Sequence, residues 1–348
     1  MELPDRLSIC IPQYNRIEFL LKSLKLISIQ DYPNLEIVIS DDCSTDNTFP
    51  EISALKVNYK FPIIYERNEI NLGYDRNYRR CIEMATGKYV IVIGNDDTIN
   101  PKYRVDQLMD FLRKNNFPDI GFCNMIEENA KDKLIERAIT TNILGTGADI
   151  AMKYYSCFSF VGGLIYKRTS FLEFNNDRFD GSIYAQTYLG VKMVSSGCML
   201  FSIKDPLVIK DIIIENKISN SYKDTIAKSW KNFKVVDGGL PSVINVLINA
   251  LHDVKADTQI RLLFIFKRIY TITYPFWILD YKENGAMPEA FGLIVGLYPG
   301  KNRNFKKLNF LNRIYIYINY FVFTIGAILM PVAIFKKIKS KLYRYFKK

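Results

Sequence analysis

The sequence has a single histidine, His252, and six scattered cysteines with neither a C-x-x-C pair nor the spacing of a metal site. A lone histidine in a predicted helix argues against Ser-His-Asp chemistry and against a histidine-rich zinc site. The cysteines lie mostly within apolar runs, so we expect buried, reduced thiols. No repeat or low-complexity tract is found, and the charged start lacks a secretory apolar region. We therefore expect a globular protein whose catalytic part lies in the cytosol.

Acidic residues are absent from residues 301–348, although this segment holds twelve of the 47 Lys and Arg residues. The preceding 300 residues carry 35 basic and 36 acidic side chains. The formal net charge of +11 therefore belongs to the C-terminal segment, and we expect no nucleic-acid-binding surface spread over the fold.

An uncharged apolar run of 22 residues, 314–335, lies within this basic segment. As a helix it would be about 33 Å long, enough to cross a bilayer core. Basic residues flank it on both sides, which fits a re-entrant or interface-lying helix bent at Pro331 better than a simple positive-inside span. We expect peripheral, re-entrant or single-span attachment to the cytoplasmic face of the cell membrane. A buried core helix is the alternative.

Strand and helix patterns alternate up to residue 126. Strands are predicted at 7–11, 36–40, 63–66, 88–93 and 119–126, and helices at 16–29, 45–56, 74–85 and 101–115. This order predicts an α/β fold with a doubly wound, mostly parallel sheet.

The remainder of the chain gives a weaker pattern. Residues 127–160 are irregular and are interpreted as a loop or lid that contacts the acceptor. Further elements are expected as a strand at 164–166, a helix from 168, a helix near 182–195, a strand pair at 199–210 and helices within 217–297. We expect a transferase domain at 1–215, a helical extension at 216–300 and a basic apolar tail at 301–348.

Two apolar runs each end in a pair of acids, Asp41-Asp42 and Asp96-Asp97. Short β-branched runs are typical of buried strands in parallel sheets. Ligands of open α/β sheets bind beyond the carboxyl ends of the strands, so we expect these carboxylates at one binding edge. They suit a hard divalent cation and the hydroxyl or ring N–H groups of a nucleotide.

The N-terminal third resembles glycosyltransferase family 2, which has the GT-A fold. The resemblance rests on an ordered set of segments, SICIPQYN (8–15), IVISDDCSTDNT (37–48), NLG (71–73), RN (76–77) and ATGKYVIVIGNDD (85–97). It is close over residues 5–125 and loose over 160–210. It implies transfer of a hexosyl or deoxyhexosyl group from a nucleotide-diphosphate sugar, with Mg²⁺ or Mn²⁺, to a glycan or lipid-linked glycan in bacterial surface-polysaccharide synthesis.

The resemblance also implies roles for individual residues. Tyr14 would flank the nucleobase, Asp42 would accept its ring N–H, and Asp41 would be structural. Asp97 would bind the metal, and Asp96 would bind ribose or sugar hydroxyls. The complete set of implied donor contacts is Pro12, Tyr14, Asn15, Asp42, Asn71, Gly73, Arg76, Asn77 and Asp96.

The general base departs from the family pattern. Inverting members place an acid near the start of a helix, and here Gln186 occupies that position. Because glutamine cannot take a proton, Asp180 is the nearest substitute, with Asp177 behind it. The missing base leaves open whether the transfer is inverting or retaining. An Asn-Asp-Asp motif without an obvious base resembles the abequosyltransferase-like branch of the family.

Two other functions remain as alternatives. A nucleotidyltransferase also uses carboxylates and a metal, but usually carries a glycine-rich loop after the first strand, where this chain reads IPQYNR. A non-catalytic nucleotide-sugar-binding relative would be compatible with Gln186.

Overall fold

The computed structural model describes residues 5–215 and 240–347. The chain divides into two compact units, residues 1–221 and 222–348. The prediction of three parts, with boundaries at 215 and 300, remains a prediction.

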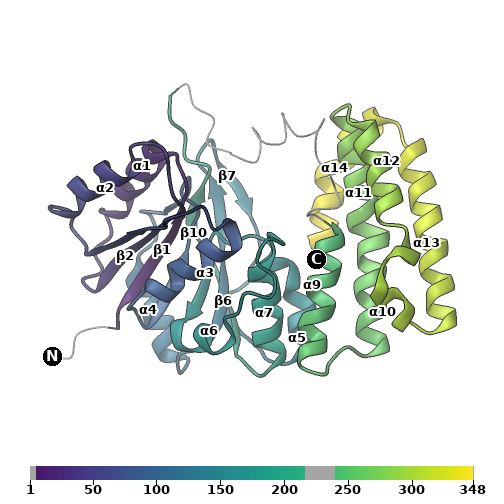
Figure 1. Cartoon of the computed structure of the whole chain (residues 1–348), viewed down its shortest axis with the longest axis horizontal. Helices are drawn as coiled ribbons and strands as arrows, with labels where there is room; N and C mark the ends of the chain where they lie inside the picture. The colour runs from purple at the N-terminus through teal and green to yellow at the C-terminus, as the bar shows by residue number, and fades with distance from the viewer. Residues whose placement is uncertain (1–4, 216–239, 348) are drawn as a thin grey trace. The chain divides into compact units, whose positions relative to one another are not determined.

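A ten-stranded sheet forms the centre of the N-terminal unit (Figure 1). Its strand order is β3-β2-β1-β4-β9-β6-β10-β5, with β7 paired to β6 and β8 paired to β10. The strands are β1 (Leu7–Gln13), β2 (Leu35–Asp41), β3 (Ile63–Arg67), β4 (Tyr89–Val92), β5 (Thr98–Ile99), β6 (Ile120–Glu127), β7 (Ala130–Ile135), β8 (Asn142–Gly145), β9 (Leu164–Lys167) and β10 (Leu200–Lys210). β3, β2, β1 and β4 are mutually parallel, whereas β9 is antiparallel to both of its neighbours.

Helices cover both faces of this sheet, as the doubly wound pattern predicts (Figure 1). They are α1 (Ile17–Ile27), α2 (Thr48–Lys56), α3 (Tyr74–Met84), α4 (Val105–Lys114), α5 (Ala148–Tyr154), the 3-10 turn η1 (Tyr155–Phe158), α6 (Arg168–Phe174) and α7 (Ala185–Ser195). Ile9 and Ile37 share one apolar core with α1, α2 and α4. Val38, on the opposite face of β2, is also fully buried, and its backbone carbonyl accepts the thiol of Cys81 in α3 at 3.3 Å. The alternation of strand side chains therefore builds two cores from one set of strands.

Two predictions for this unit were wrong. Residues 127–160 do not form an irregular lid, because they contain β7, β8, α5 and η1, and both strands join the main sheet. Within the predicted strand pair at 199–210, residues 200–210 form the single strand β10, with an irregular register around Pro206 where it lies beside β6.

Glu36 is a buried carboxylate that joins β1, β2 and the turn before β4. It accepts hydrogen bonds from the Ser8 hydroxyl at 2.6 Å and from both the backbone N–H and the hydroxyl of Thr86 at 2.7 and 2.6 Å. Burial alone would raise its pKa, but these bonds and the charge of Arg6 outweigh burial, so the pKa of Glu36 is lowered.

Glu36→Gln is expected to lower the free energy of unfolding by about 2 kcal/mol at pH 7, because charge-assisted hydrogen bonds are lost. A lowered pKa in the folded state stabilises the fold above the unfolded pKa, and the contribution is lost as pH falls through the folded pKa. The difference should therefore shrink toward about pH 3. Urea unfolding of the native chain and of Glu36→Gln at both pH values measures this difference. Glu69→Gln, at an exposed position, is the control. An equal difference at the two pH values would contradict the ionic contribution.

The C-terminal unit is helical. Its elements are α9 (Leu240–Asp253), α10 (Gln259–Arg268), the π-turn η3 (Ile269–Thr273), α11 (Tyr274–Glu283), α12 (Met287–Gly296), the 3-10 turns η4 (Pro299–Lys301) and η5 (Arg303–Lys307), α13 (Phe310–Leu329) and α14 (Val332–Lys347). α13 packs on α10, η3 and α11, and the Tyr274 and Thr324 hydroxyls bond at 2.6 Å. Lys339 of α14 pairs with Asp280 of α11 at 2.5 Å.

The predicted bend at Pro331 is present, because α13 and the start of α14 meet at 106° around this residue. Among the described residues, Gln259–Glu283 also has the length and apolar composition of a membrane span, although half of its most apolar window is buried within the protein. That helix was not predicted as a membrane span from the sequence.

Candidate functional site

Side chains tie the ends of β1 and β4 together. Asn95 donates its amide to Oε1 of Gln13 at 3.0 Å, and Arg16 pairs with Asp96 at 2.8 Å. Asn15 and Arg16 have φ values of 53° and 61°, so the chain turns sharply between β1 and α1. Tyr14 lies at this turn with 47% of its surface exposed, which leaves its ring available to a ligand.

Asp97 is the most buried carboxylate beyond β4, with 2% of its surface exposed. It accepts the backbone N–H groups of Gly94 at 3.1 Å and of Asp211 at 3.2 Å. Burial and then the charge of Asp96 raise the pKa of Asp97 to about 7. Asp211 follows β10 at a φ of 56° and pairs with Lys210 at 3.0 Å. The carboxylates of Asp96, Asp97 and Asp211 therefore form one acidic cluster at the strand ends.

This acidic cluster fits a hard divalent cation. Burial raises the pKa of Asp96, Arg16 opposes that shift and Asp211 adds to it. Burial is the main cause of both raised pKa values and neighbouring carboxylates add to them, so a cation bound there would favour the charged forms. Within residues 5–215 and 240–347, no three His, Cys, Asp or Glu side chains are already arranged as a metal-ligand group. Asp97 and Asp211 are the candidate ligands.

Asp42 anchors the loop that begins α3. Its Oδ1 accepts Asn68 Nδ2 at 3.0 Å and Leu72 N at 2.6 Å, and its Oδ2 accepts Gly73 N at 2.9 Å. Gly73 has a φ of 81°, a conformation that favours glycine, and its N–H also lies 3.0 Å from Oδ1 of Asn71. A carboxylate has about four acceptor positions, of which Asp42 uses three, and the residue is 3% exposed.

The neighbouring Asp41 is fully buried and holds its own turn. It accepts the Ser44 N–H at 2.9 Å and the Tyr65 hydroxyl at 2.6 Å. Pro12 lies within β1 in register with Ser40, next to this turn.

Asn77 and Arg76 are adjacent on α3 but lie in different surroundings. Asn77 is buried and donates to the carbonyls of Gln13 and Ser40 at 3.2 and 3.0 Å, so it holds α3 against β1 and β2. Arg76 is partly exposed and pairs with Glu83 at 2.7 Å on the same helix. The structure brings Asn77 to the strand ends and directs Arg76 along α3.

Asp180 lies in a bidentate ion pair with α3. Arg79, whose side chain is 5% exposed, donates Nε to Oδ1 of Asp180 at 2.9 Å and Nη2 to Oδ2. Asp75 of α3 also accepts the backbone N–H groups of Ile183 at 2.7 Å and Ala185 at 3.1 Å. α3 therefore fixes the chain that leads into α7.

Gln186 is 1% exposed near the start of α7. Its amide nitrogen makes only long contacts, 3.5 Å to the Ser159 carbonyl and 3.4 Å to the Ile183 carbonyl. Its Oε1 is buried and has no hydrogen-bond partner. An unpaired buried oxygen is costly, so the Gln186 side chain is poorly satisfied by the protein itself.

Arg137 was not identified from the sequence, although its side chain holds the backbone of segments that lie between Asp97 and α7. The Arg137 guanidinium donates to the backbone carbonyls of Cys123, Cys157, Phe160 and Gly162 at 2.6 to 3.2 Å. Burial lowers the pKa of Arg137. A Cβ on Gly162 would lie 2.9 Å from Oδ2 of Asp97, so this glycine allows a close approach.

Arg16 and Asp211 were missed as well. Asp211 follows an apolar strand, so the rule that selected Asp42 and Asp97 could have found it. Arg137 follows β7, a strand that the sequence pattern did not predict, and no sequence signal identifies it.

Comparison with known proteins places this site in a family. The family model described as "Glycosyl transferase family 2" matches residues 8–194, more than half of the chain. The abequosyltransferase RfbV of Salmonella typhimurium is 33% identical over 223 residues, covering 58% of this chain and 66% of that protein. A putative colanic acid biosynthesis glycosyl transferase, WcaA of Escherichia coli, is 33% identical over 96 residues, covering 27% of this chain and 34% of that protein.

A solved structure supports the fold over most of the chain. Staphylococcus aureus TarS residues 1–349 in complex with UDP has a TM-score of 0.59 at 15% identity, covering 92% of this chain and 90% of that one. The chain spans less than two thirds of the length of the curated relatives it matches. The predicted resemblance is confirmed, and the chain belongs to glycosyl transferase family 2.

Proposed function

We propose that the N-terminal unit transfers a sugar from a nucleotide-diphosphate sugar to a glycan of the bacterial surface, in a metal-dependent reaction. The observation that carries this proposal is the acidic cluster of Asp96, Asp97 and Asp211, on the same edge of the sheet as Tyr14 and Asp42. The relatives' names, an abequosyltransferase and a putative colanic acid biosynthesis glycosyl transferase, support sugar transfer in glycan synthesis.

The donor's nucleoside would bind at the ends of β1 and β2. Tyr14 offers an exposed ring for the base, and Asp42 retains one acceptor position for a ring N–H. Pro12 and Asn15 shape that turn, while Asn71, Gly73 and Asn77 hold the start of α3 beside it. Asp96 would accept ribose or sugar hydroxyls, and Arg76, which pairs with Glu83 on α3, is the remaining donor-side candidate.

Asp97, with Asp211 beside it, would hold Mg²⁺ or Mn²⁺. A divalent cation stabilises the negative charge that develops on the departing diphosphate. Arg16, paired with Asp96, and Lys210, paired with Asp211, orient these carboxylates. Arg137 and Gly162 keep the 157–162 segment against Asp97, which helps to exclude water from the cluster.

The identity of the general base is also a proposal. The Arg79 ion pair favours a positioning role for Asp180, and the unpaired Oε1 of Gln186 is suited to accept a hydrogen bond from the acceptor hydroxyl. Orienting that hydroxyl requires no proton transfer to Gln186.

Asp180→Asn and Arg79→Gln are expected to lower turnover by similar factors and the free energy of unfolding by about 2 kcal/mol, because both break the same partly buried ion pair. Steady-state kinetics with donor-affinity measurements check this, with the exposed Glu173→Gln as the control. If Asp180→Asn alone lost about two to four orders of magnitude in turnover with donor affinity kept, Asp180 would be the base.

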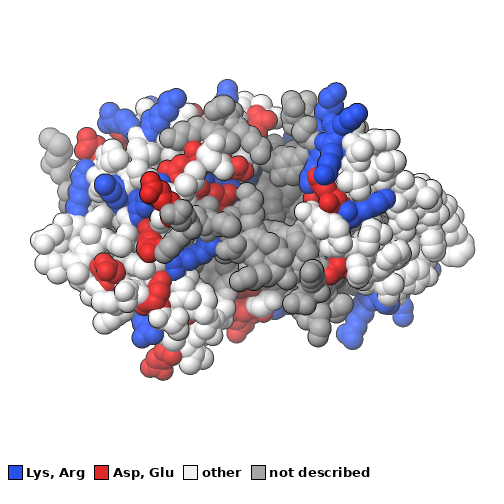
Figure 2. Space-filling model, turned by 90° about the horizontal axis from the view of Figure 1, so that it is seen from above, with Lys and Arg blue, Asp and Glu red and all other residues white. Residues whose placement is uncertain are grey.

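We further propose that the C-terminal unit rests on the cytoplasmic face of the membrane, where lipid-linked glycans would be accessible. Figure 2 shows a broad uncharged surface on this unit with Lys and Arg side chains at its margins. α13 exposes large apolar side chains, among them Ile318, Phe321, Ile325 and Leu329. The 106° bend after α13 suits an interface-lying helix pair better than a straight span.

A thermal-shift panel of UDP-, GDP-, CDP- and dTDP-sugars, with and without Mn²⁺, tests the donor proposal. We expect one nucleotide class to raise the melting temperature, and Mn²⁺ to increase the shift. No shift with any member of the panel would count against nucleotide-sugar binding.

A further inference from the structure

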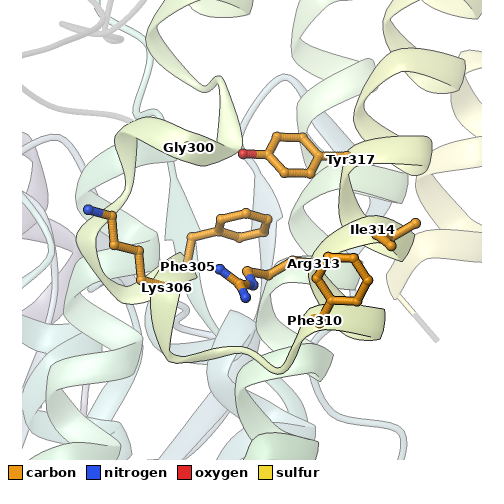
Figure 3. A pocket seen from close by; sticks show the side chains of 7 residues that line it. All are labelled: Gly300, Phe305, Lys306, Phe310, Arg313, Ile314 and Tyr317. Atoms are coloured by element: carbon orange, nitrogen blue, oxygen red, sulfur yellow. The ribbon is translucent and has the colours of Figure 1, made fainter.

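A pocket of about 320 Å³ lies in the C-terminal unit, between the η4–η5 segment and the start of α13. It is lined by Gly300, Phe305, Lys306, Phe310, Arg313, Ile314 and Tyr317. Figure 3 shows the Arg313 guanidinium pointing across the pocket toward the side on which Lys306 lies, with the Phe305 and Phe310 rings close by. The lining thus combines two cations with aromatic and aliphatic side chains.

The two cations have no acidic partner within the described part of the chain. No ion pair is found for Lys306 or Arg313, whereas the adjacent Lys307 lies 3.5 Å from Asp257. The Nε of Arg313 is buried and has no hydrogen-bond partner. Since no acid of the described residues pairs with either cation and the Nε of Arg313 is unsatisfied, an anion from outside the chain is the natural partner.

An apolar stripe of α13 continues from this pocket. Phe310 and Ile314 belong both to the pocket lining and to the exposed side of α13. The same side carries Leu311, Ile318, Phe321, Val322, Ile325 and Leu329, which are 52 to 74% exposed. The opposite side of α13 is buried within the unit through Ile316 and Tyr320. A cationic pocket at one end of an exposed apolar stripe matches a molecule with an anionic head and a long apolar tail.

We infer that this pocket binds the phosphate of an anionic membrane phospholipid. Lys306 and Arg313 hold the phosphate oxygens, and the acyl chains lie along the stripe of α13. This inference deepens and rests on the membrane association proposed above, and it adds a defined headgroup site to a general attraction between basic residues and an anionic surface.

The test is binding to vesicles of phosphatidylcholine alone and of phosphatidylcholine mixed with phosphatidylglycerol, using the full chain. The pocket variant is Lys306→Gln/Arg313→Gln, with Arg313→Lys as a conservative version. The matched control is Lys301→Gln/Arg303→Gln, which removes the same charge from exposed positions in the same segment. Circular dichroism confirms that each variant is folded.

At low salt both double variants should bind the mixed vesicles more weakly than the native chain does, because removing positive charge weakens the diffuse attraction to the anionic surface. At ~1 M salt the Debye length is about 3 Å, so diffuse attraction is screened while direct contacts persist. At this high salt concentration the control should bind the mixed vesicles with the same affinity as the native chain. The pocket variant should bind about tenfold more weakly, and Arg313→Lys should recover part of the loss.

Equal binding by the native chain, the pocket variant and the control at high salt would overturn the pocket and leave membrane association standing. A native chain that binds neither vesicle would overturn both proposals. Inorganic phosphate alone is expected not to raise the melting temperature. If it did so in the native chain and not in the pocket variant, the ligand would be a free phosphate and not a lipid.

Discussion

Asp97→Asn is expected to lower sugar transfer by about 10³-fold or more, because it would remove a charged ligand from the proposed cation that stabilises the departing diphosphate. The substitution keeps the side chain's size, and burial already raises the pKa of Asp97 to about 7, so a neutral side chain at this position should leave the protein folded. Turnover measured with Mn²⁺, alongside a thermal melt, checks both parts. A chelator should abolish turnover in the native chain, and Mn²⁺ or Mg²⁺ should restore it.

Asp110→Asn provides the control for this experiment, because that carboxylate forms an exposed ion pair on α4 away from the strand ends. It should leave turnover unchanged. Metal-dependent turnover at the native rate in Asp97→Asn would eliminate Asp97 as the metal ligand and leave Asp211 and Asp96 as the carboxylates to examine.

Asp42→Ala is expected to weaken binding of the nucleoside diphosphate by about 1.5 to 3 kcal/mol, roughly 10- to 100-fold. The variant removes the predicted acceptor for the base and also releases the N–H groups of Leu72 and Gly73 at the start of α3. Donor affinity should therefore fall more than the rate of the chemical step. Calorimetry with the nucleoside diphosphate, combined with steady-state kinetics, separates the two effects.

Tyr65→Phe is the matched control for Asp42→Ala. It removes one hydrogen bond to the neighbouring Asp41 and leaves Asp42 and its three donors in place. Unchanged affinity in the control and reduced affinity in Asp42→Ala would support the assignment. Equal affinity in Asp42→Ala and the native chain would remove Asp42 from the donor site.

The sequence was sufficient to predict the strand ends. Strongly apolar runs followed by acids predicted β2 and β4. Both strands pair in parallel with β1, which brings Asp42 and Asp97 to the same edge of the sheet. These features are local in sequence, so residue patterns report them directly. The bend at Pro331 was predictable for the same reason, because proline disrupts helix geometry wherever it occurs inside a helix.

Features that depend on distant partners were not predictable. β7 and β8 are short strands that add to β6 and β10, so their pairing comes from the sheet and not from a strong pattern of their own. The multiple donors to Asp42 and the Arg79–Asp180 ion pair likewise join residues far apart in the chain. Sequence could nominate Asp180 as a free carboxylate but could not show that both its oxygens are engaged.

The central claim is that the N-terminal unit breaks a nucleotide-sugar bond in a metal-dependent reaction. The most direct measurement is release of nucleoside diphosphate from a panel of UDP-, GDP-, CDP- and dTDP-sugars, with a glycan acceptor extract from bacterial membranes and Mn²⁺. The account predicts release from one nucleotide class by the native chain, dependent on both acceptor and Mn²⁺, and none by Asp97→Asn. Donor binding by the native chain without release from any sugar in the panel would contradict it and identify a non-catalytic nucleotide-sugar-binding relative.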